Sequence, residues 1–231
     1  MRRKRGIIRS KKLKYIIIVL TFIAIVTTAI LTKQPFLTML PLCISLIVMA
    51  LSAEASRMSF LIGGLNSILY AVVYWTLGLY GIAAQAMLVS FPFQIVTFFL
   101  WKRRAYKHSV TFKRLSTKGW LLVGGLFAAA SAGVIIVLLA KNSPYAILDG
   151  ITSLLGTLAT LLTMLAYSEY TYVNLLNGAI SIALNAQLAF NDPSQSTHFI
   201  YAIYAFYCIV LGFFNVRKLY REQQTEGGTA V

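Results

Sequence analysis

Four amide and hydroxyl side chains recur at helical spacing in the apolar stretch YTYVNLLNGAISIALN, residues 170–185. They are Asn174, Asn177, Ser181 and Asn185, and Tyr170 extends the series by one turn. In an α-helix, spacings of three or four residues place side chains in one narrow stripe. A buried amide without a partner costs free energy, so something polar must meet this stripe. The chemistry that it indicates is hydrogen bonding to a solute.

A second apolar stretch, residues 58–77, carries Ser59, Gly63, Asn66, Tyr70 and Tyr74 at similar spacing. Asn66, Gln94, Asn177 and Tyr207 lie near the middle of their apolar stretches, so we expect them at one depth of a bilayer. Tyrosines add flat faces with a polar tip, suited to stacking on a heteroaromatic ring. The predicted substrate-binding residues are therefore Asn66, Gln94, Tyr170, Asn174, Asn177, Tyr204 and Tyr207. The alternative for each polar residue is a hydrogen bond between helices, which holds membrane helices together.

Other kinds of chemistry find little support in the sequence. The acids Glu54, Asp149 and Glu169 lie at the ends of apolar stretches, whereas a proton or sodium relay usually places one near mid-membrane. Cys43 and Cys208 have no partner at metal-ligand spacing, and no phosphate-binding glycine loop or carboxylate cluster occurs. We therefore expect no enzyme, metal or cofactor, and passive transport rather than ion coupling.

The elements that position these residues are membrane spans. Of the 231 residues, 58% are hydrophobic and only 12% are charged, which indicates a polytopic membrane protein. Most of the apolar stretches have the roughly 17 to 25 residues that cross a bilayer as a helix. There are eight of them, at residues 14–32, 36–52, 58–77, 80–101, 119–140, 145–166, 170–190 and 198–216.

The net charge of +15 is explained by topology rather than by nucleic-acid binding. Eight basic residues precede the first stretch, seven lie between the fourth and fifth, and three follow the eighth. If the spans alternate, Arg57 joins these on one side and only Lys33 and Lys141 face the other. The positive-inside rule then places both termini in the cytoplasm.

The third and seventh stretches are alike, because GGLNSILYAVVY at 63–74 aligns with NLLNGAISIALN at 174–185 and brings Asn66 onto Asn177. We therefore expect a 3+1+3 parallel repeat, as in SWEET sugar carriers, with an extra first helix. The predicted units are a basic N-terminus and peripheral helix (1–33), a first repeat (34–104), a basic loop and linker helix (105–143), a second repeat (144–220) and a cytoplasmic tail (221–231).

The chain resembles the PnuC family of bacterial vitamin transporters. The resemblance rests on the Gly-Leu-Tyr before the fourth stretch, on Gln94 followed seven residues later by Trp101, and on Asp149 about twenty residues before the polar stripe. It implies an eight-helix, SWEET-like protein of the bacterial inner membrane, a homotrimer, and a substrate held by Gln94, Asn177 and aromatic residues. The family's two tryptophans in the seventh span are here Tyr170 and Val173.

The function expected from this resemblance is import of nicotinamide riboside by facilitated diffusion through a mid-membrane site. The alternatives are a deoxyribonucleoside or another vitamin such as thiamine in the same fold, and a non-transport membrane subunit. The last alternative predicts that the two polar stripes pair with each other and leave no cavity.

Overall fold

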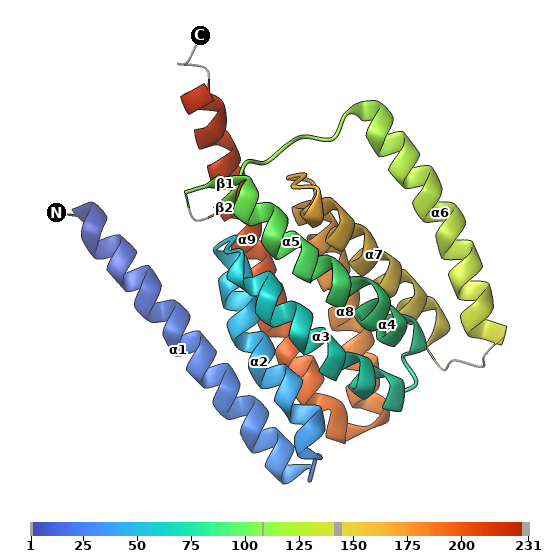
Figure 1. The fold of residues 1–231 in the computed structure, drawn as a ribbon. Helices are drawn as coiled ribbons and strands as arrows, with labels where there is room; N and C mark the ends of the chain where they lie inside the picture. The colour runs from blue at the N-terminus through green and yellow to red at the C-terminus, as the bar shows by residue number, and fades with distance from the viewer. Residues whose placement is uncertain (1, 108, 141–144, 228–231) are drawn as a thin grey trace.

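The computed structural model describes residues 2–107, 109–140 and 145–227, and within them eight helical segments are long and apolar enough to cross a membrane. Six of the spans form a bundle, and Figure 1 shows the other two, α1 and α6, on opposite sides of it. This confirms the predicted all-α membrane fold with eight spans. The spans are α1 (Arg2–Leu31), α2 (Phe36–Ala53), α3 (Met58–Thr76), α4 to α5 (Tyr80–Arg103), α6 (Thr117–Ala140), α7 (Ala146–Met164), α8 (Tyr170–Asn191) and α9 (Ser196–Gly227), which follows the short 3-10 helix η2 (Pro193–Gln195).

The bundle consists of two three-helix units with the linker helix outside them. In the first unit α3 packs against α2 and α5, and in the second α8 packs against α7 and α9. The units meet where α2 packs on α9 and α5 packs on α7. Helix α6 contacts α7 and α4, and Leu138 is its one buried residue. The polar stripe of α8 and the tyrosines Tyr70 and Tyr74 of α3 face the space between the units.

The fourth span is interrupted by a π-helical segment, η1 (Ala86–Ser90), between α4 (Tyr80–Gln85) and α5 (Phe91–Arg103). The Phe91 N–H donates to the Ala86 carbonyl, which is the five-residue step of a π-helix. Pro92 follows at once, and a proline has no N–H to bond the carbonyl four residues earlier and clashes with it. A wider turn at this point accommodates the proline without breaking the span.

Asp149 ties the two units together from the first turn of α7. Its fully buried carboxylate accepts hydrogen bonds from the N–H groups of Gly81 and Ile82, each at 2.8 Å. The first N–H groups of a helix have no partner within it, and the positive end of the helix dipole favours an anion. Asp149 therefore caps α4 from a neighbouring helix. A Cβ at position 81 would lie 3.1 Å from both carboxylate oxygens, which explains the glycine.

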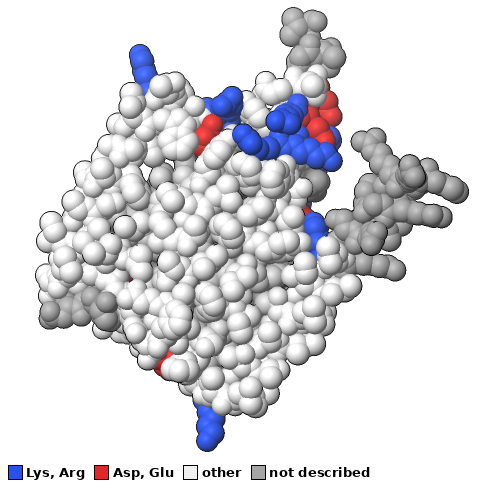
Figure 2. All heavy atoms as spheres, turned by 180° about the vertical axis from the view of Figure 1, so that it is seen from behind, with Lys and Arg blue, Asp and Glu red and all other residues white. Residues whose placement is uncertain are grey.

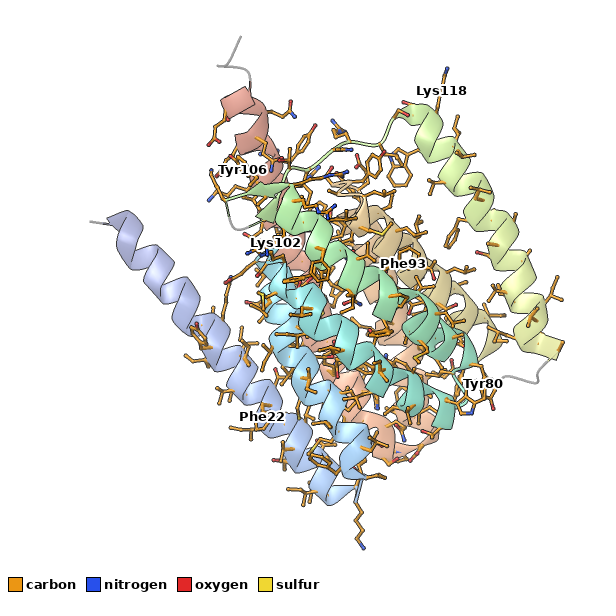
Figure 3. All side chains as sticks on the ribbon, in the orientation of Figure 1. Phe22, Tyr80, Phe93, Lys102, Tyr106 and Lys118 are labelled. Atoms are coloured by element: carbon orange, nitrogen blue, oxygen red, sulfur yellow. The ribbon has the colours of Figure 1, made fainter. Side chains whose placement is uncertain are left out.

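One end of the bundle, here called the basic end, carries most of the charged residues of the described chain. Figure 2 shows Lys and Arg gathered at this end beside acidic residues, above a broad uncharged belt, and Figure 3 places Lys102, Tyr106 and Lys118 there. The hairpin of β1 (Ala105–Tyr106) and β2 (Ser109–Val110) also lies at this end. Opposite it, the far end carries Tyr80.

The hairpin and the segment after it are fastened to the ends of α9 and α7. The side-chain amide of Gln223 accepts from the Phe112 N–H at 2.9 Å and donates to the Val110 carbonyl at 2.8 Å. Lys113 pairs with the turn after α7, because its N–H donates to the Ala166 carbonyl at 2.8 Å. Beside these bonds, Lys107 Nζ lies 2.8 Å from a Glu222 carboxylate oxygen. The hydrogen bond to Glu222 raises the pKa of Lys107 above its ordinary value.

Candidate functional site

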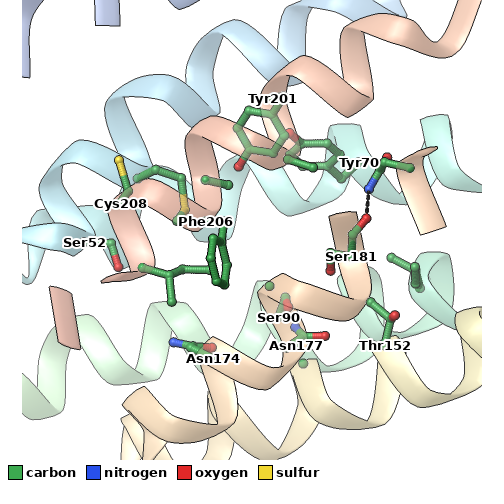
Figure 4. A pocket seen from close by; sticks show the side chains of 18 of the residues that line it. Ser52, Tyr70, Ser90, Thr152, Asn174, Asn177, Ser181, Tyr201, Phe206 and Cys208 are labelled. Carbon is green, nitrogen blue, oxygen red and sulfur yellow. Dashed lines mark hydrogen bonds between the residues drawn. The ribbon is translucent and has the colours of Figure 1, made fainter. Parts of the chain in front are cut away.

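A cavity of about 330 Å³ lies in the middle of the bundle, between the two three-helix units. The stripe of α8 forms one wall, with Tyr170, Asn174, Asn177, Ser181 and Asn185. Tyrosines of α3 and α9 form the facing wall, and Figure 4 shows Tyr70 and Tyr201 across the cavity from Asn177. The rings of Tyr70 and Tyr74 are stacked, with centroids 5.2 Å apart. The cavity therefore has an amide wall and an aromatic wall.

A second chamber of about 290 Å³ adjoins the first on the side of the basic end. The two chambers share Gln85, Ser90, Asn174 and Asn177 in their walls, so they lie directly against each other. Hydroxyl and amide groups also line the second chamber, including those of Ser59, Gln94, Thr97, Thr160 and Thr163. A solute that leaves the first chamber towards the basic end thus meets polar groups throughout.

The chambers are electrically neutral and contain polar atoms without partners. Among the described residues that line them, none carries a formal charge. Asn177 Oδ1 and Thr152 Oγ1 are buried and have no hydrogen-bond partner in the described part of the chain. Such groups are costly unless a ligand or water pairs with them. The site is therefore suited to a solute that supplies hydrogen-bond donors and no net negative charge.

Glycines let the side chains of the site approach neighbouring helices closely. A Cβ at Gly63 would lie 2.6 Å from Gln94 Oε1, so the Gln94 amide rests on the bare backbone of α3. At Gly178 a Cβ would lie 2.9 Å from the Phe206 ring, which faces the first chamber. The positions of Gln94 and Phe206 therefore depend on these two glycines.

Four of the seven sequence-predicted site residues line the chambers. Tyr170, Asn174 and Asn177 line the first, and Gln94 lines the second together with the two asparagines. Tyr170 is only 7% exposed, and Phe112 stacks on it with ring centroids 6.4 Å apart. One face of Tyr170 is thus covered by the segment that follows the hairpin.

The structure does not bring Asn66, Tyr204 or Tyr207 into either chamber. Asn66 is buried and donates to the Pro41 carbonyl at 2.9 Å and to Ser45 Oγ at 2.8 Å, so it joins α3 to α2. Tyr204 and Tyr207 line a different crevice, between α1, α2 and α9. The Tyr204 hydroxyl donates to the Leu46 carbonyl of α2 at 2.9 Å, so this side chain is held against α2 outside the two chambers.

The sequence prediction missed Gln85, whose side-chain amide donates to Ser90 Oγ at 2.7 Å in the wall of both chambers. Gln85 and Gln94 are nine residues apart, which in a continuous α-helix is about half a turn from a common face. The π-helical segment absorbs one extra residue and brings both amides to the same space. Pro92 was the available signal for it. Thr152, Tyr70 and Tyr74 were also missed, although the two tyrosines lie in the α3 stripe noted above.

Residues 35–218 match the sequence profile of a family described as nicotinamide mononucleotide transporter. The chain belongs to this transporter family. The match covers both three-helix units and the linker helix, and it confirms the resemblance expected from the sequence.

Two curated proteins, both described as nicotinamide riboside transporter PnuC, are similar to the chain. Over 168 residues the chain is 29% identical to the PnuC of Neisseria mucosa. The aligned part is 70% of this chain and 64% of that protein, so the chain spans slightly less than two thirds of its length. Over 215 residues it is 23% identical to the PnuC of Haemophilus influenzae, covering 90% and 91% of the two chains.

A solved structure has the same fold. It is described as the crystal structure of the vitamin B3 transporter PnuC, and it superposes with a TM-score of 0.77 at 22% identity, covering 91% of this chain and 92% of that one.

Proposed function

We propose that this chain imports nicotinamide riboside across the bacterial inner membrane through the two central chambers. The observation that carries the proposal is a neutral, amide-lined cavity in which the Asn177 Oδ1 and Thr152 Oγ1 atoms have no partner in the described chain. The ribose hydroxyls and the carboxamide of the riboside would supply donors for them. A cavity of about 330 Å³ lies within the range of about 300 to 1,000 Å³ usual for small-molecule sites.

The absence of lining charge among the described residues favours the riboside over the mononucleotide. A phosphate dianion placed in these chambers would lose its water and find no cation to pair with, which is expensive in an apolar surrounding. Nicotinamide riboside carries one positive charge, on its pyridinium ring. The rings of Tyr70, Tyr74 and Tyr201 offer faces that attract such a cation.

In this proposal Gln94, Asn174 and Asn177 bind the polar groups of the riboside. The tyrosines Tyr70, Tyr74 and Tyr201 contact its pyridinium ring. We assign Asn66, Tyr204 and Tyr207 to packing instead. The non-transport alternative required paired polar stripes without a cavity, and the cavity between α3 and α8 disfavours it.

Transport in this proposal is passive. Asp149 is occupied as the cap of α4, and Glu169 is buried at the start of α8 with Arg114 3.7 Å away, so neither faces the chambers as a free acid. We place the basic end in the cytoplasm, by the positive-inside rule. Labelling of single cysteines introduced at Lys33 and Lys118 from the two sides of intact cells tests this orientation. A homotrimer, implied by the family resemblance, is tested by light scattering.

Calorimetry on the purified protein tests the substrate. Nicotinamide riboside should bind, whereas nicotinamide mononucleotide, thymidine and thiamine, titrated in parallel, should bind at least about tenfold more weakly, since each tenfold step is about 1.4 kcal/mol. Uptake of the riboside into proteoliposomes without an ion gradient then tests passive transport. Binding of thymidine in place of the riboside would contradict the proposed substrate and leave the site standing.

A further inference from the structure

A crevice of about 380 Å³ lies between α1, α2 and α9, on the side of the basic end. It exists because α1 leans away from the bundle towards its N-terminal end (Figure 1). Ile25 and Ala29, further along α1, are buried, and Ile25 belongs to a cluster with Leu42, whereas none of the residues from Leu13 to Leu20 is buried. The crevice is therefore the space between a helix that is anchored at one end and the bundle beside it.

The walls of the crevice are mostly apolar, and all three helices that form them are membrane spans. They carry Ile18 of α1, Ile47, Ala50 and Leu51 of α2, and Tyr204, Tyr207 and Leu211 of α9. The Tyr204 hydroxyl already donates a hydrogen bond to the Leu46 carbonyl at 2.9 Å, so it needs no polar ligand in the crevice. Unfilled space would forfeit the dispersion contacts of these walls. At the depth of a membrane span, the molecule that meets them is a lipid chain.

The size of the crevice fits one acyl chain. At about 30 Å³ per small group, the volume of a water molecule in the liquid, 380 Å³ holds roughly a dozen methylenes. The lining residues extend from Ile18 to Lys14 on α1 and from Ile47 to Glu54 on α2, so an acyl chain between them would have its headgroup end at the basic end.

A positive charge stands at the mouth. Lys14 Nζ lines the crevice and lies 3.4 Å from Glu54 Oε1, and the two side chains are 29% and 53% exposed. An exposed pair of this kind is weak, and an ammonium has three N–H donors, so Lys14 can also bind a phosphate. Lys14 follows a stretch of the sequence in which seven of the twelve residues are basic.

We propose that this crevice binds one anionic phospholipid, with an acyl chain between α1, α2 and α9 and its phosphate at Lys14. The lipid gives α1 a role, because it fills the space that this helix leaves beside the bundle. Cys208 lines both the crevice and the first chamber, so α9 is the wall between the lipid and the substrate cavity.

Native mass spectrometry of the full-length protein tests the proposal. The protein is purified in detergent and mixed with equal amounts of phosphatidylglycerol and phosphatidylcholine with the same acyl chains. We expect one retained phosphatidylglycerol per chain in preference to phosphatidylcholine. Lys14→Gln should lower this preference about fivefold, the equivalent of about 1 kcal/mol for one lysine near an anionic lipid. Ala50→Trp, which fills the crevice, should remove the retained lipid whatever its headgroup.

Matched variants on α6 serve as controls, because that helix lies on the opposite side of the bundle. Lys118→Gln and Ala129→Trp change exposed residues there and should leave lipid retention as in the wild type. Equal retention of both lipids by the wild type, or unchanged retention by Ala50→Trp, would overturn the proposal. A change in oligomeric state on Ala50→Trp, with lipid retention unchanged, would also overturn it, because a second copy of the chain would then occupy the crevice. Lys14→Gln leaves the apolar walls intact and remains informative if Ala50→Trp does not fold.

Discussion

At the scale of single residues, the two asparagines that the repeat alignment superposes have different surroundings. Asn177 lines both chambers with an unpaired oxygen, whereas the Asn66 side-chain nitrogen bonds Pro41 and Ser45 within the first unit. Asn177→Leu should weaken riboside binding about fivefold and reduce uptake, since one hydrogen bond contributes about 1 kcal/mol, and the melting temperature should stay unchanged. Calorimetry and thermal unfolding in detergent measure the two effects.

Asn66→Leu is the matched variant, with the same change of side chain at the other asparagine. It should lower the free energy of unfolding by about 1 kcal/mol, as for other hydrogen bonds between membrane helices, while riboside binding remains. A loss of binding at an unchanged melting temperature would place Asn66 in the site and contradict the assignment to packing.

Gly63 tests the position of Gln94. Gly63→Ala puts a Cβ 2.6 Å from Gln94 Oε1, and the flexible end of the glutamine must swing away. We expect riboside affinity to fall about fivefold, the equivalent of one lost hydrogen bond of about 1 kcal/mol, with little loss of stability. Gly125→Ala on α6 is the control, because a Cβ there meets nothing within 4 Å. Equal affinities of the two variants would show that Gln94 does not contact the substrate.

The polar stripe of α8 could be predicted from the sequence, because residue spacing alone decides which side chains share a face of one helix. Asn174 and Asn177 line the cavity as that spacing requires. The rotation of a helix about its axis in the bundle depends on the helices that pack against it, so the spacing of residues within one helix cannot predict it. For this reason Tyr201 faces the cavity while Tyr204 faces the crevice beside α1.

At the scale of elements, the ends of the spans were predicted to within a few residues wherever the helix ends at the point where the sequence changes from apolar to polar. The exceptions are α1 and α9, which begin at Arg2 and end at Gly227, well beyond the apolar residues 14–32 and 198–216. Hydropathy marks the part of a helix that lies in the membrane, and these helices continue into polar sequence. The π-helical segment was not predicted, since its backbone pattern depends on how the chain accommodates Pro92.

The contact of α7 with α4 depends on Asp149. An asparagine has one acceptor oxygen where the carboxylate offers two, so Asp149→Asn should lose one of the two bonds to Gly81 and Ile82. Hydrogen bonds to charged groups contribute about 1.5 to 3 kcal/mol, and we expect a loss of stability of that size in thermal unfolding. Asp192→Asn, which changes the exposed cap of η2, should have little effect because asparagine caps helices equally well. Similar melting temperatures for the two variants would refute the cap.

At the scale of the whole molecule, an aromatic layer lies between the chambers and the hairpin at the basic end. Phe60 packs on Trp101 with ring centroids 4.6 Å apart, Trp101 on Phe112 at 5.7 Å, and Phe112 on Tyr170. The rings come from α3, α5, the segment after the hairpin and α8, so the layer joins both three-helix units. Phe112 is the member on an irregular segment, held by the Gln223 amide. Alternating access requires the path to close at one end, and we expect this layer to close it at the basic end.

Removing the Phe112 ring should therefore open the chambers to the basic end. In a Cys43→Ser background Cys208, which is buried in the wall of the first chamber, is the one remaining thiol of the sequence. Phe112→Ala should speed its reaction with a charged, membrane-impermeant thiol reagent about tenfold, if the ring contributes about 1.4 kcal/mol to the closed state, and added riboside should slow it again. Phe99→Ala, at a ring that is 55% exposed on α5, is the matched control. If both variants react at the rate of the background protein, the path is closed elsewhere, and the hairpin serves only to fasten α9 to the bundle.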